Sequence, residues 1–182
     1  MKEKSKLIRT QAARTANKEH SVPLYLTSSF VFDNAEHGRA MFADEVQGNI
    51  YSRYSNPNTT EFIDKVRDFE GAEAGLAFSS GMAAVFASIA GLLRSGDHIV
   101  AFRSIFGSTH QLFTQLLPRW GITTTYVDAS KPEDFEPALR PETKMVFLET
   151  PSNPGLELVD LEWLGKLKQK HNFILNVDNC FA

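Results

Sequence analysis

Apolar side chains recur with two different patterns along the chain, and the change between them divides the sequence. Residues 1–57 show little strand pattern and include one helical patch near 35–42. Helical spacing begins after Thr59, in the apolar residues Phe62, Ile63, Val66 and Phe69. Gly71 follows them and is suited to end a helix. We therefore expect an N-terminal arm over residues 1–57 and one α/β domain over residues 58–182.

Strand and helix patterns alternate after residue 71. Strands are predicted at 74–78, 98–102, 123–127, 144–149 and 173–177. Helices are predicted at 82–93, 108–119 and 160–170, with a short helical turn near 133–138. Short apolar strands joined by helices predict a mainly parallel sheet with helices on both faces. No covering helix follows the last predicted strand, so we expect this chain to be the N-terminal part of a longer protein.

Composition narrows the classes of function. The 19 Lys and Arg against 22 Asp and Glu leave a net charge of -3, so no overall basic field favours nucleic acid or an anionic membrane. One cysteine, Cys180, excludes an internal disulfide and fits a reducing compartment. No window reaches the roughly 18 apolar residues of a membrane span, and the histidines lack metal-ligand spacing. We expect a cytoplasmic protein without a metal, acting on small molecules.

Asp178 interrupts the apolar pattern of the last predicted strand. A carboxylate at the C-terminal end of a buried parallel strand lies where such folds bind ligands, and it can hold a cationic ring nitrogen there. The alternative is a helix cap or a solvated turn, because Asp before Asn179 is also good turn chemistry. Position alone does not separate the two interpretations.

The run from Ser79 to Ala84 follows a predicted strand and opens a predicted helix. Free backbone N–H groups and the positive end of the helix dipole attract a phosphate there, and Gly81 and Met82 lie at the start. An ordinary serine N-cap is the alternative. The P-loop and three-glycine dinucleotide patterns are absent, which favours a cofactor with a single phosphate.

Three further segments carry candidate side chains. Tyr51 and Arg53 lie two residues apart, on one side of a segment expected to be extended, and could bind phosphate oxygens together. Asn153 lies in a loop stiffened by two prolines after the strand 144–149, and Phe106 in the loop after 98–102 could stack on a planar ring. The alternatives are a surface arginine, a rigid turn without function and a core phenylalanine.

Together these motifs resemble the pyridoxal-phosphate enzymes of cysteine and methionine metabolism, the cystathionine γ-synthase family of fold type I, over nearly the whole chain. The resemblance implies pyridoxal 5'-phosphate as cofactor and a homodimer or homotetramer with shared active sites. Tyr51 and Arg53 would reach a neighbouring subunit's phosphate, which Gly81 and Met82 bind within the subunit. Asn153 would contact the substrate carboxylate. Asp178 would pair with the pyridine nitrogen, raise its pKa and keep the ring protonated.

Two departures from the family pattern matter. Phe106 stands where most members have a tyrosine, so it can stack on the ring but cannot transfer a proton. With its flanking motifs it makes the chain most similar to the O-succinylhomoserine sulfhydrylases, which implies that sulfide replaces the γ-ester of O-succinylhomoserine or O-acetylhomoserine to give homocysteine. The family's Schiff-base lysine lies about two dozen residues beyond the aspartate, after this chain ends.

Other functions remain open on the sequence. Cystathionine γ-synthase, which uses cysteine, and the cystathionine and methionine γ-lyases, which eliminate instead of replacing, share these motifs. A noncatalytic binding domain that keeps the sheet but has lost the cofactor is an alternative of a different class. The lysine and the bound cofactor would distinguish that domain from an enzyme.

Overall fold

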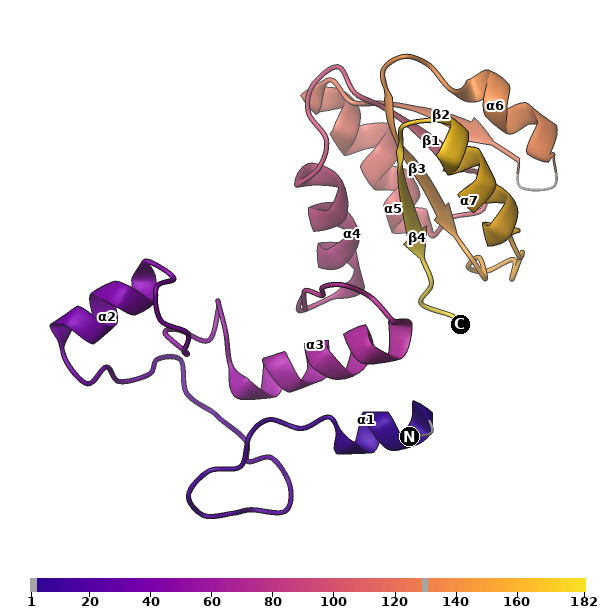
Figure 1. The fold of residues 1–182 in the computed structure, drawn as a ribbon. Helices are drawn as coiled ribbons and strands as arrows, with labels where there is room; N and C mark the ends of the chain where they lie inside the picture. Colours follow the sequence, from indigo (N-terminus) through magenta and orange to yellow (C-terminus); the bar gives the residue numbers. More distant parts are fainter. Residues whose placement is uncertain (1–2, 129–130) are drawn as a thin grey trace. The chain divides into compact units, whose positions relative to one another are not determined.

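The computed structural model describes residues 3–128 and 131–182 (Figure 1). The chain forms two compact units, divided between Ala77 and Phe78. The first unit holds the helices α1 (Glu3–Arg9), α2 (Ala35–Phe42) and α3 (Pro57–Glu70). The second holds a parallel sheet and its helices.

Local sequence explains where α3 begins and ends. The Asn56 side chain accepts the Asn58 N–H at 2.9 Å, and Pro57 occupies the first turn, where its missing N–H costs nothing. Gly71 ends the helix in the left-handed region, with φ 63°. The helix predicted from Thr59 to Gly71 is therefore confirmed, and it begins two residues earlier than predicted, at Pro57.

The start of α3 also holds the preceding arm. The Asn58 side chain accepts the Tyr25 N–H at 2.8 Å and donates to the Pro23 carbonyl at 2.7 Å. Asn56 donates to the Tyr25 carbonyl at 3.0 Å. Two asparagine side chains thus pair the backbone of an otherwise irregular segment with the helix.

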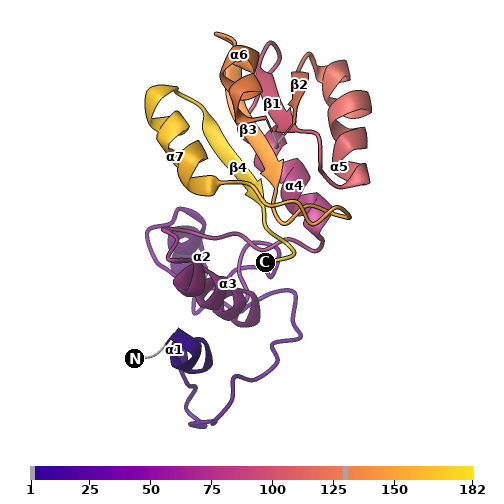
Figure 2. The ribbon, with the colours of Figure 1, turned by 90° about the vertical axis from the view of Figure 1, so that its right-hand side faces the viewer.

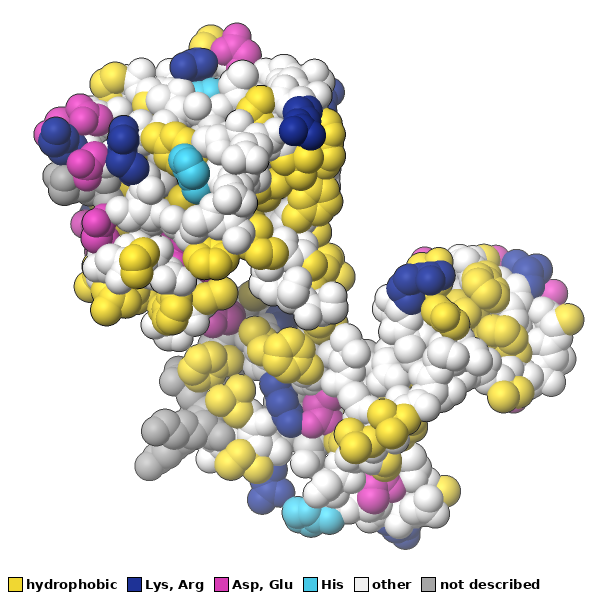
Figure 3. Space-filling view, turned by 180° about the vertical axis from the view of Figure 1, so that it is seen from behind, with side chains coloured by type: hydrophobic (Ala, Val, Ile, Leu, Met, Phe, Trp, Pro, Cys, Tyr) yellow, Lys and Arg dark blue, Asp and Glu magenta, His cyan; other side chains and the backbone are white. Residues whose placement is uncertain are grey.

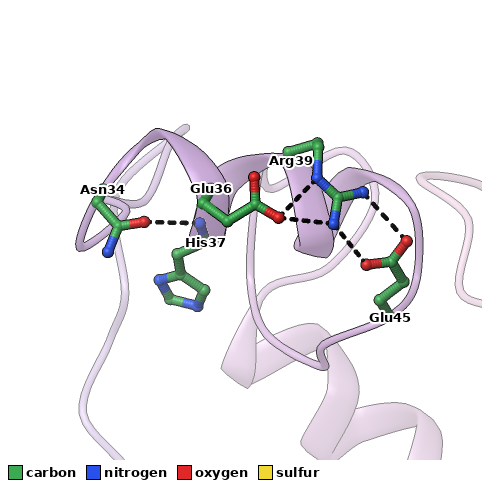
Figure 4. A network of polar contacts seen from close by, with 5 residues as sticks. All are labelled: Asn34, Glu36, His37, Arg39 and Glu45. Atoms are coloured by element: carbon green, nitrogen blue, oxygen red, sulfur yellow. Dashed lines mark hydrogen bonds and ion pairs between the residues drawn. The ribbon is translucent and has the colours of Figure 1, made fainter.

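A polar network surrounds α2 (Figure 4). Asn34 caps the helix by accepting the His37 N–H at 2.8 Å. The Arg39 guanidinium lies between Glu36 and Glu45, at 2.8 and 2.7 Å, and these hydrogen bonds raise its pKa and lower that of Glu45. All three charged side chains are exposed, so the network fixes the local loop more than it stabilises the fold.

The second unit is built on four parallel strands, β1 (His98–Phe102), β2 (Thr123–Val127), β3 (Thr143–Glu149) and β4 (Ile174–Asp178). Their order in the sheet is β2-β1-β3-β4, so each connection between strands is a crossover. Because all neighbours are parallel, the carboxyl ends of the four strands lie at the same edge of the sheet (Figure 2). The predicted strands at 98–102 and 123–127 are confirmed; β3 begins one residue earlier than predicted, and β4 is shifted by one residue toward the C-terminus.

Helices cover both faces of this sheet (Figure 1). One face packs against α4 (Gly81–Ala90) and the helical stretch that begins with α5 (Gly107–Gln111), through a cluster that includes Ile99, Ala101 and Phe147. The other packs against α6 (Phe135–Ala138) and α7 (Leu161–Lys170), through a cluster that includes Val100, Val146 and Leu148. Strand residues alternate between the two clusters, as expected for a buried parallel sheet. The predicted α/β architecture is confirmed.

Two predicted elements are wrong. Residues 74–78 form no strand in the structure, and Leu76 is 83% exposed. A strand needs a partner for its backbone groups, and the sheet of the second unit uses only β1 to β4.

The helix predicted at 108–119 is broken after Gln111 into a π segment (Leu112–Leu116) and a 3₁₀ segment (Leu117–Trp120). Pro118 lacks an N–H for the α-helical ladder, and the Thr114 hydroxyl donates to the His110 carbonyl at 2.8 Å, in competition with it. The short turn predicted near 133–138 is a 3₁₀ segment (Pro132–Asp134) followed by α6.

Candidate active site

Two carboxylates lie next to each other at the carboxyl edge of the sheet. Glu149 of β3 and Asp178 of β4 are register partners, so they lie on the same face. That face is the one covered by α4 and α5, because Phe147, two residues before Glu149, packs in their cluster. Asn176, two residues before Asp178, donates to Ser88 of α4 at 2.9 Å.

Asp178 ends β4 with a half-buried side chain. Its Oδ1 accepts the Cys180 N–H at 3.2 Å, and its backbone carbonyl accepts the Thr150 N–H at 3.0 Å. The hydrogen bond from the Cys180 N–H, two residues after the aspartate, forms the turn that the sequence allowed as the alternative role of Asp178. The carboxylate also raises the pKa of the Cys180 thiol through a hydrogen bond, with burial adding to the effect. Asp178 therefore shapes the turn and still presents a carboxylate at the sheet edge.

Glu149 is a residue that the sequence reasoning left without a role. Its side chain is almost completely buried, and Oε2 accepts the backbone N–H of Phe106 at 2.6 Å. Burial raises the pKa of the Glu149 carboxyl, and the negative charge of Asp178 raises it further. The backbone N–H groups of Phe106 and Asn153 act in the opposite direction, but the net effect is a raised pKa. The signal that could have found it is the one that marked Asp178, a carboxylate ending an apolar strand.

The start of α4 is open to an anion. Ser80 caps the helix by accepting the Ala83 N–H at 3.2 Å, as the alternative interpretation proposed. Within residues 3–128 and 131–182, the N–H groups of Gly81 and Met82 have no hydrogen-bond acceptor. A Cβ built on Gly81 would meet nothing within 4 Å. The cap and the phosphate site are therefore compatible, because the serine uses only one of the free donors.

Phe106 immediately precedes α5, beside this helix start. Its ring is 40% exposed, and the Thr109 hydroxyl one turn later lies 3.8 Å from the Met82 sulfur. The exposed ring contradicts the interpretation of Phe106 as a core residue. An apolar ring left at a polar sheet edge can stack on a planar ligand.

The loop that carries Asn153 is braced by a buried serine. Ser152 donates its N–H to the Glu157 carbonyl at 3.1 Å, and its hydroxyl accepts the Glu157 N–H at 3.0 Å. The Glu157 carboxylate accepts the Ser104 hydroxyl at 2.6 Å, which links this loop to the loop after β1. The peptide bonds before Pro151 and Pro154 are both cis. Asn153 is half-buried within this ordered loop.

Tyr51 and Arg53 lie in the first unit. The segment is a turn, in which the Tyr51 carbonyl accepts the Tyr54 N–H at 2.8 Å, so the expected extended conformation is wrong. The Arg53 guanidinium nevertheless lies 5.0 Å from the centroid of the Tyr51 ring and 5.5 Å from that of Tyr54. The Arg53 and Tyr51 side chains therefore lie together through a cation–π contact, and not because an extended segment places them on one side as the sequence suggested.

The structure thus gathers five of the seven predicted site residues at one edge of the second unit. Gly81, Met82, Phe106, Asn153 and Asp178 all follow the carboxyl ends of strands or begin the helix beside them. Their roles toward a cofactor stay predictions. No helix of the described residues is long and apolar enough to cross a membrane, and no group of three or more metal-binding side chains occurs among them.

Comparison with known proteins identifies close relatives. The sequence profile described as "Cys/Met metabolism PLP-dependent enzyme" matches residues 4–182. An O-succinylhomoserine sulfhydrylase from Pseudomonas aeruginosa is 44% identical over 96% of this chain and 43% of its own length. An L-methionine gamma-lyase from Fusobacterium nucleatum is 43% identical over 89% of this chain and 41% of its own. The chain spans less than half the length of these relatives.

A solved structure extends the likeness to three dimensions. An O-acetylhomoserine (thiol)-lyase from Campylobacter jejuni, which carries N'-pyridoxyl-lysine-5'-monophosphate, superposes with a TM-score of 0.92 at 29% identity. The match covers 98% of this chain and 44% of that one. The fold is therefore that of the fold type I pyridoxal-phosphate enzymes, of which this chain forms part.

Proposed function

The chain belongs to the family of pyridoxal-phosphate-dependent enzymes of cysteine and methionine metabolism, and from this premise we propose a γ-replacement reaction for the protein that contains it. Sulfide replaces the acyl ester at the γ-carbon of O-succinylhomoserine or O-acetylhomoserine. The products are homocysteine and succinate or acetate. The similarity to the sulfhydrylase from Pseudomonas aeruginosa supports this reaction.

One observation carries the cofactor part of the proposal. The free N–H groups of Gly81 and Met82 and the carboxylate of Asp178 lie on the same face and edge of the sheet. A phosphate fits the first and a protonated ring nitrogen fits the second, so the two ends of one pyridoxal phosphate match two complementary sites. Phe106 leaves an apolar ring exposed beside them.

The residues then have separate tasks. Pyridoxal phosphate, when bound, withdraws electrons from the substrate through its protonated ring. Asp178 holds the proton on the ring nitrogen, Gly81 and Met82 bind the phosphate, and Phe106 packs on the ring. Asn153 binds the substrate carboxylate with its amide. Phe106 has no hydroxyl, so proton transfer belongs to other groups.

The first unit supports a shared site between subunits. Several apolar side chains of the arm are strongly exposed, including Leu24 (78%), Leu26 (92%) and Val31 (96%). Hydrophobic side chains are also visible at the surface in Figure 3. Apolar surface of this kind favours contact with another copy, as expected for an arm that brings Tyr51 and Arg53 to a neighbour's phosphate. We therefore assign the arm to a homodimer or homotetramer contact.

The test uses the full-length protein. O-succinylhomoserine and O-acetylhomoserine are each supplied with sulfide, with cysteine or with neither, and homocysteine, cystathionine and 2-oxobutanoate are measured. Homocysteine formed only with sulfide supports the proposal. Cystathionine as the main product would assign a synthase, and an oxoacid without added thiol would assign a γ-lyase, the second candidate favoured by the Fusobacterium nucleatum relative.

Cofactor binding is tested separately. A yellow protein whose visible absorption band disappears with borohydride is the expected result, and mass spectrometry of the reduced protein identifies the modified lysine. A colourless protein that added pyridoxal phosphate cannot change would instead assign the noncatalytic binding domain.

A further inference from the structure

Glu149 connects the segments that carry three of the predicted site residues. Its carboxylate accepts the Phe106 N–H at 2.6 Å, and the Asn153 backbone N–H also stabilises its charge. Asp178 is its register partner on the neighbouring strand. A side chain that is 3% exposed thus reaches the loop after β1, the loop after β3 and the end of β4.

The placement is unusual for a carboxylate with no cationic partner among the described residues. Burying a charged or polar group is costly unless hydrogen bonds satisfy it, and here the principal donor is a backbone N–H. That N–H belongs to the residue whose ring is exposed at the site, just before the start of α5. The bond therefore ties the backbone of Phe106 to β3, and the position of that backbone limits the directions that the ring can take.

The geometry points to Glu149 as a positioning residue of the proposed cofactor site. Its carboxylate acts as an acceptor that holds the Phe106 backbone, so that the ring packs on the cofactor. It does not touch the cofactor itself in this role. The inference rests on the proposed function and adds a residue that acts through Phe106.

Two substitutions separate the acceptor from the charge. Glu149→Gln keeps an oxygen at the same distance from the backbone but removes the charge. Glu149→Asp keeps the charge but is one methylene shorter, which draws the oxygens away from the Phe106 N–H. Glu162→Gln, on the exposed side of α7 and paired with Lys166, is the matched control.

The measurements are the affinity of the full-length apoprotein for pyridoxal phosphate and the induced circular dichroism of the bound cofactor. We expect Glu149→Gln to stay within about threefold of the parent affinity and to keep the dichroism signal, like Glu162→Gln. Glu149→Asp should bind about tenfold more weakly and lose most of the signal, because the ring is no longer held. Apoprotein melting curves establish that each variant is folded.

The opposite pattern would overturn the inference. If Glu149→Asp matches the parent protein while Glu149→Gln does not, the charge matters and the acceptor does not. Equal behaviour of both variants and the parent would show that the contact positions nothing. Should Glu149→Asp fail to fold, Glu149→Met, which has no oxygen to accept the Phe106 N–H, takes its place: a lost dichroism signal in a folded protein supports the role, and a retained signal contradicts it. A parent protein that binds no pyridoxal phosphate contradicts the proposed function instead.

Discussion

Glu149 and Asp178 are paired residues of adjacent parallel strands, yet their carboxylates have different surroundings. Glu149 is buried against the Phe106 backbone, and burial raises the pKa of its carboxyl, to which the charge of Asp178 adds. Asp178 is half-buried at the end of its strand. One carboxylate thus accepts a backbone N–H, and the other is half-buried at the carboxyl edge of the sheet, where we propose that it faces a cationic ring nitrogen.

Replacing Asp178 by Asn should reduce activity more than cofactor content. The amide keeps the size and the turn contact with Cys180 but removes the charge that favours a protonated ring nitrogen. We expect kcat to fall by about a hundredfold or more, while the yellow colour remains. Steady-state kinetics and cofactor absorbance of the full-length variant check this, with Glu162→Gln as control. Unchanged kcat would remove Asp178 from the site.

Ser80 allows the helix cap to be separated from the phosphate site. Ser80→Ala loses the acceptor of the Ala83 N–H and should lower the free energy of unfolding by about 1 kcal/mol. Ser80→Asp keeps the cap and suits the helix dipole, so stability is retained, but its charge repels a phosphate at Gly81. We expect weaker pyridoxal-phosphate binding for Asp than for Ala, measured by titration of the apoprotein. The reverse order would argue against a phosphate there.

A shared active site predicts complementation between inactive variants. Co-expressed Arg53→Ala and Asp178→Ala chains should form mixed dimers in which one site draws both intact residues, one from each subunit. Random pairing then restores about a quarter of the parental activity. Each variant expressed alone is the control. Activity that stays at the level of the single variants would place Arg53 and Asp178 in the same subunit's site, or Arg53 outside it.

His98 makes stability depend on pH at the opposite edge of the sheet. Its ring nitrogens lie 2.8 Å from the Thr143 hydroxyl and 2.9 Å from that of Thr125. Burial lowers the pKa of His98, Arg140 lowers it further and Glu142 opposes the shift. Folding therefore favours the neutral imidazole over the charged one.

The pKa of His98 in the folded protein lies below the unfolded value of about 6.5. The contribution of the neutral imidazole to stability is therefore complete above about pH 6.5 and is lost as the pH falls toward the folded pKa. We expect the free energy of unfolding to decrease between pH 7 and 5, by at most about 1.4 kcal/mol per pH unit from this group. Urea titrations of the full-length protein measure it. His98→Gln should flatten the dependence relative to the exposed control His20→Gln, and parallel curves for the two variants would refute the assignment.

Much of the fold was predictable because hydrophobic periodicity is a local property. The strands at 98–102 and 123–127 and the helix α7 follow from the identity of neighbouring residues. The strand predicted at 74–78 failed since strand formation needs a partner, which local pattern cannot supply. The interrupted helix after α5 shows the same limit, because apolar spacing concealed the effects of Thr114 and Pro118.

By itself, the sequence determined the family, the parallel α/β architecture and the candidate residues Gly81, Phe106, Asn153 and Asp178. It could do so because motifs and the ends of apolar strands are formed by residues that are neighbours in the sequence. Only the tertiary structure decided the role of Glu149, whose partner Phe106 lies 43 residues away in sequence. It also decided that Tyr51 and Arg53 meet across a turn. The physical reason is that such contacts depend on strand register and loop path, which arise from packing between distant segments.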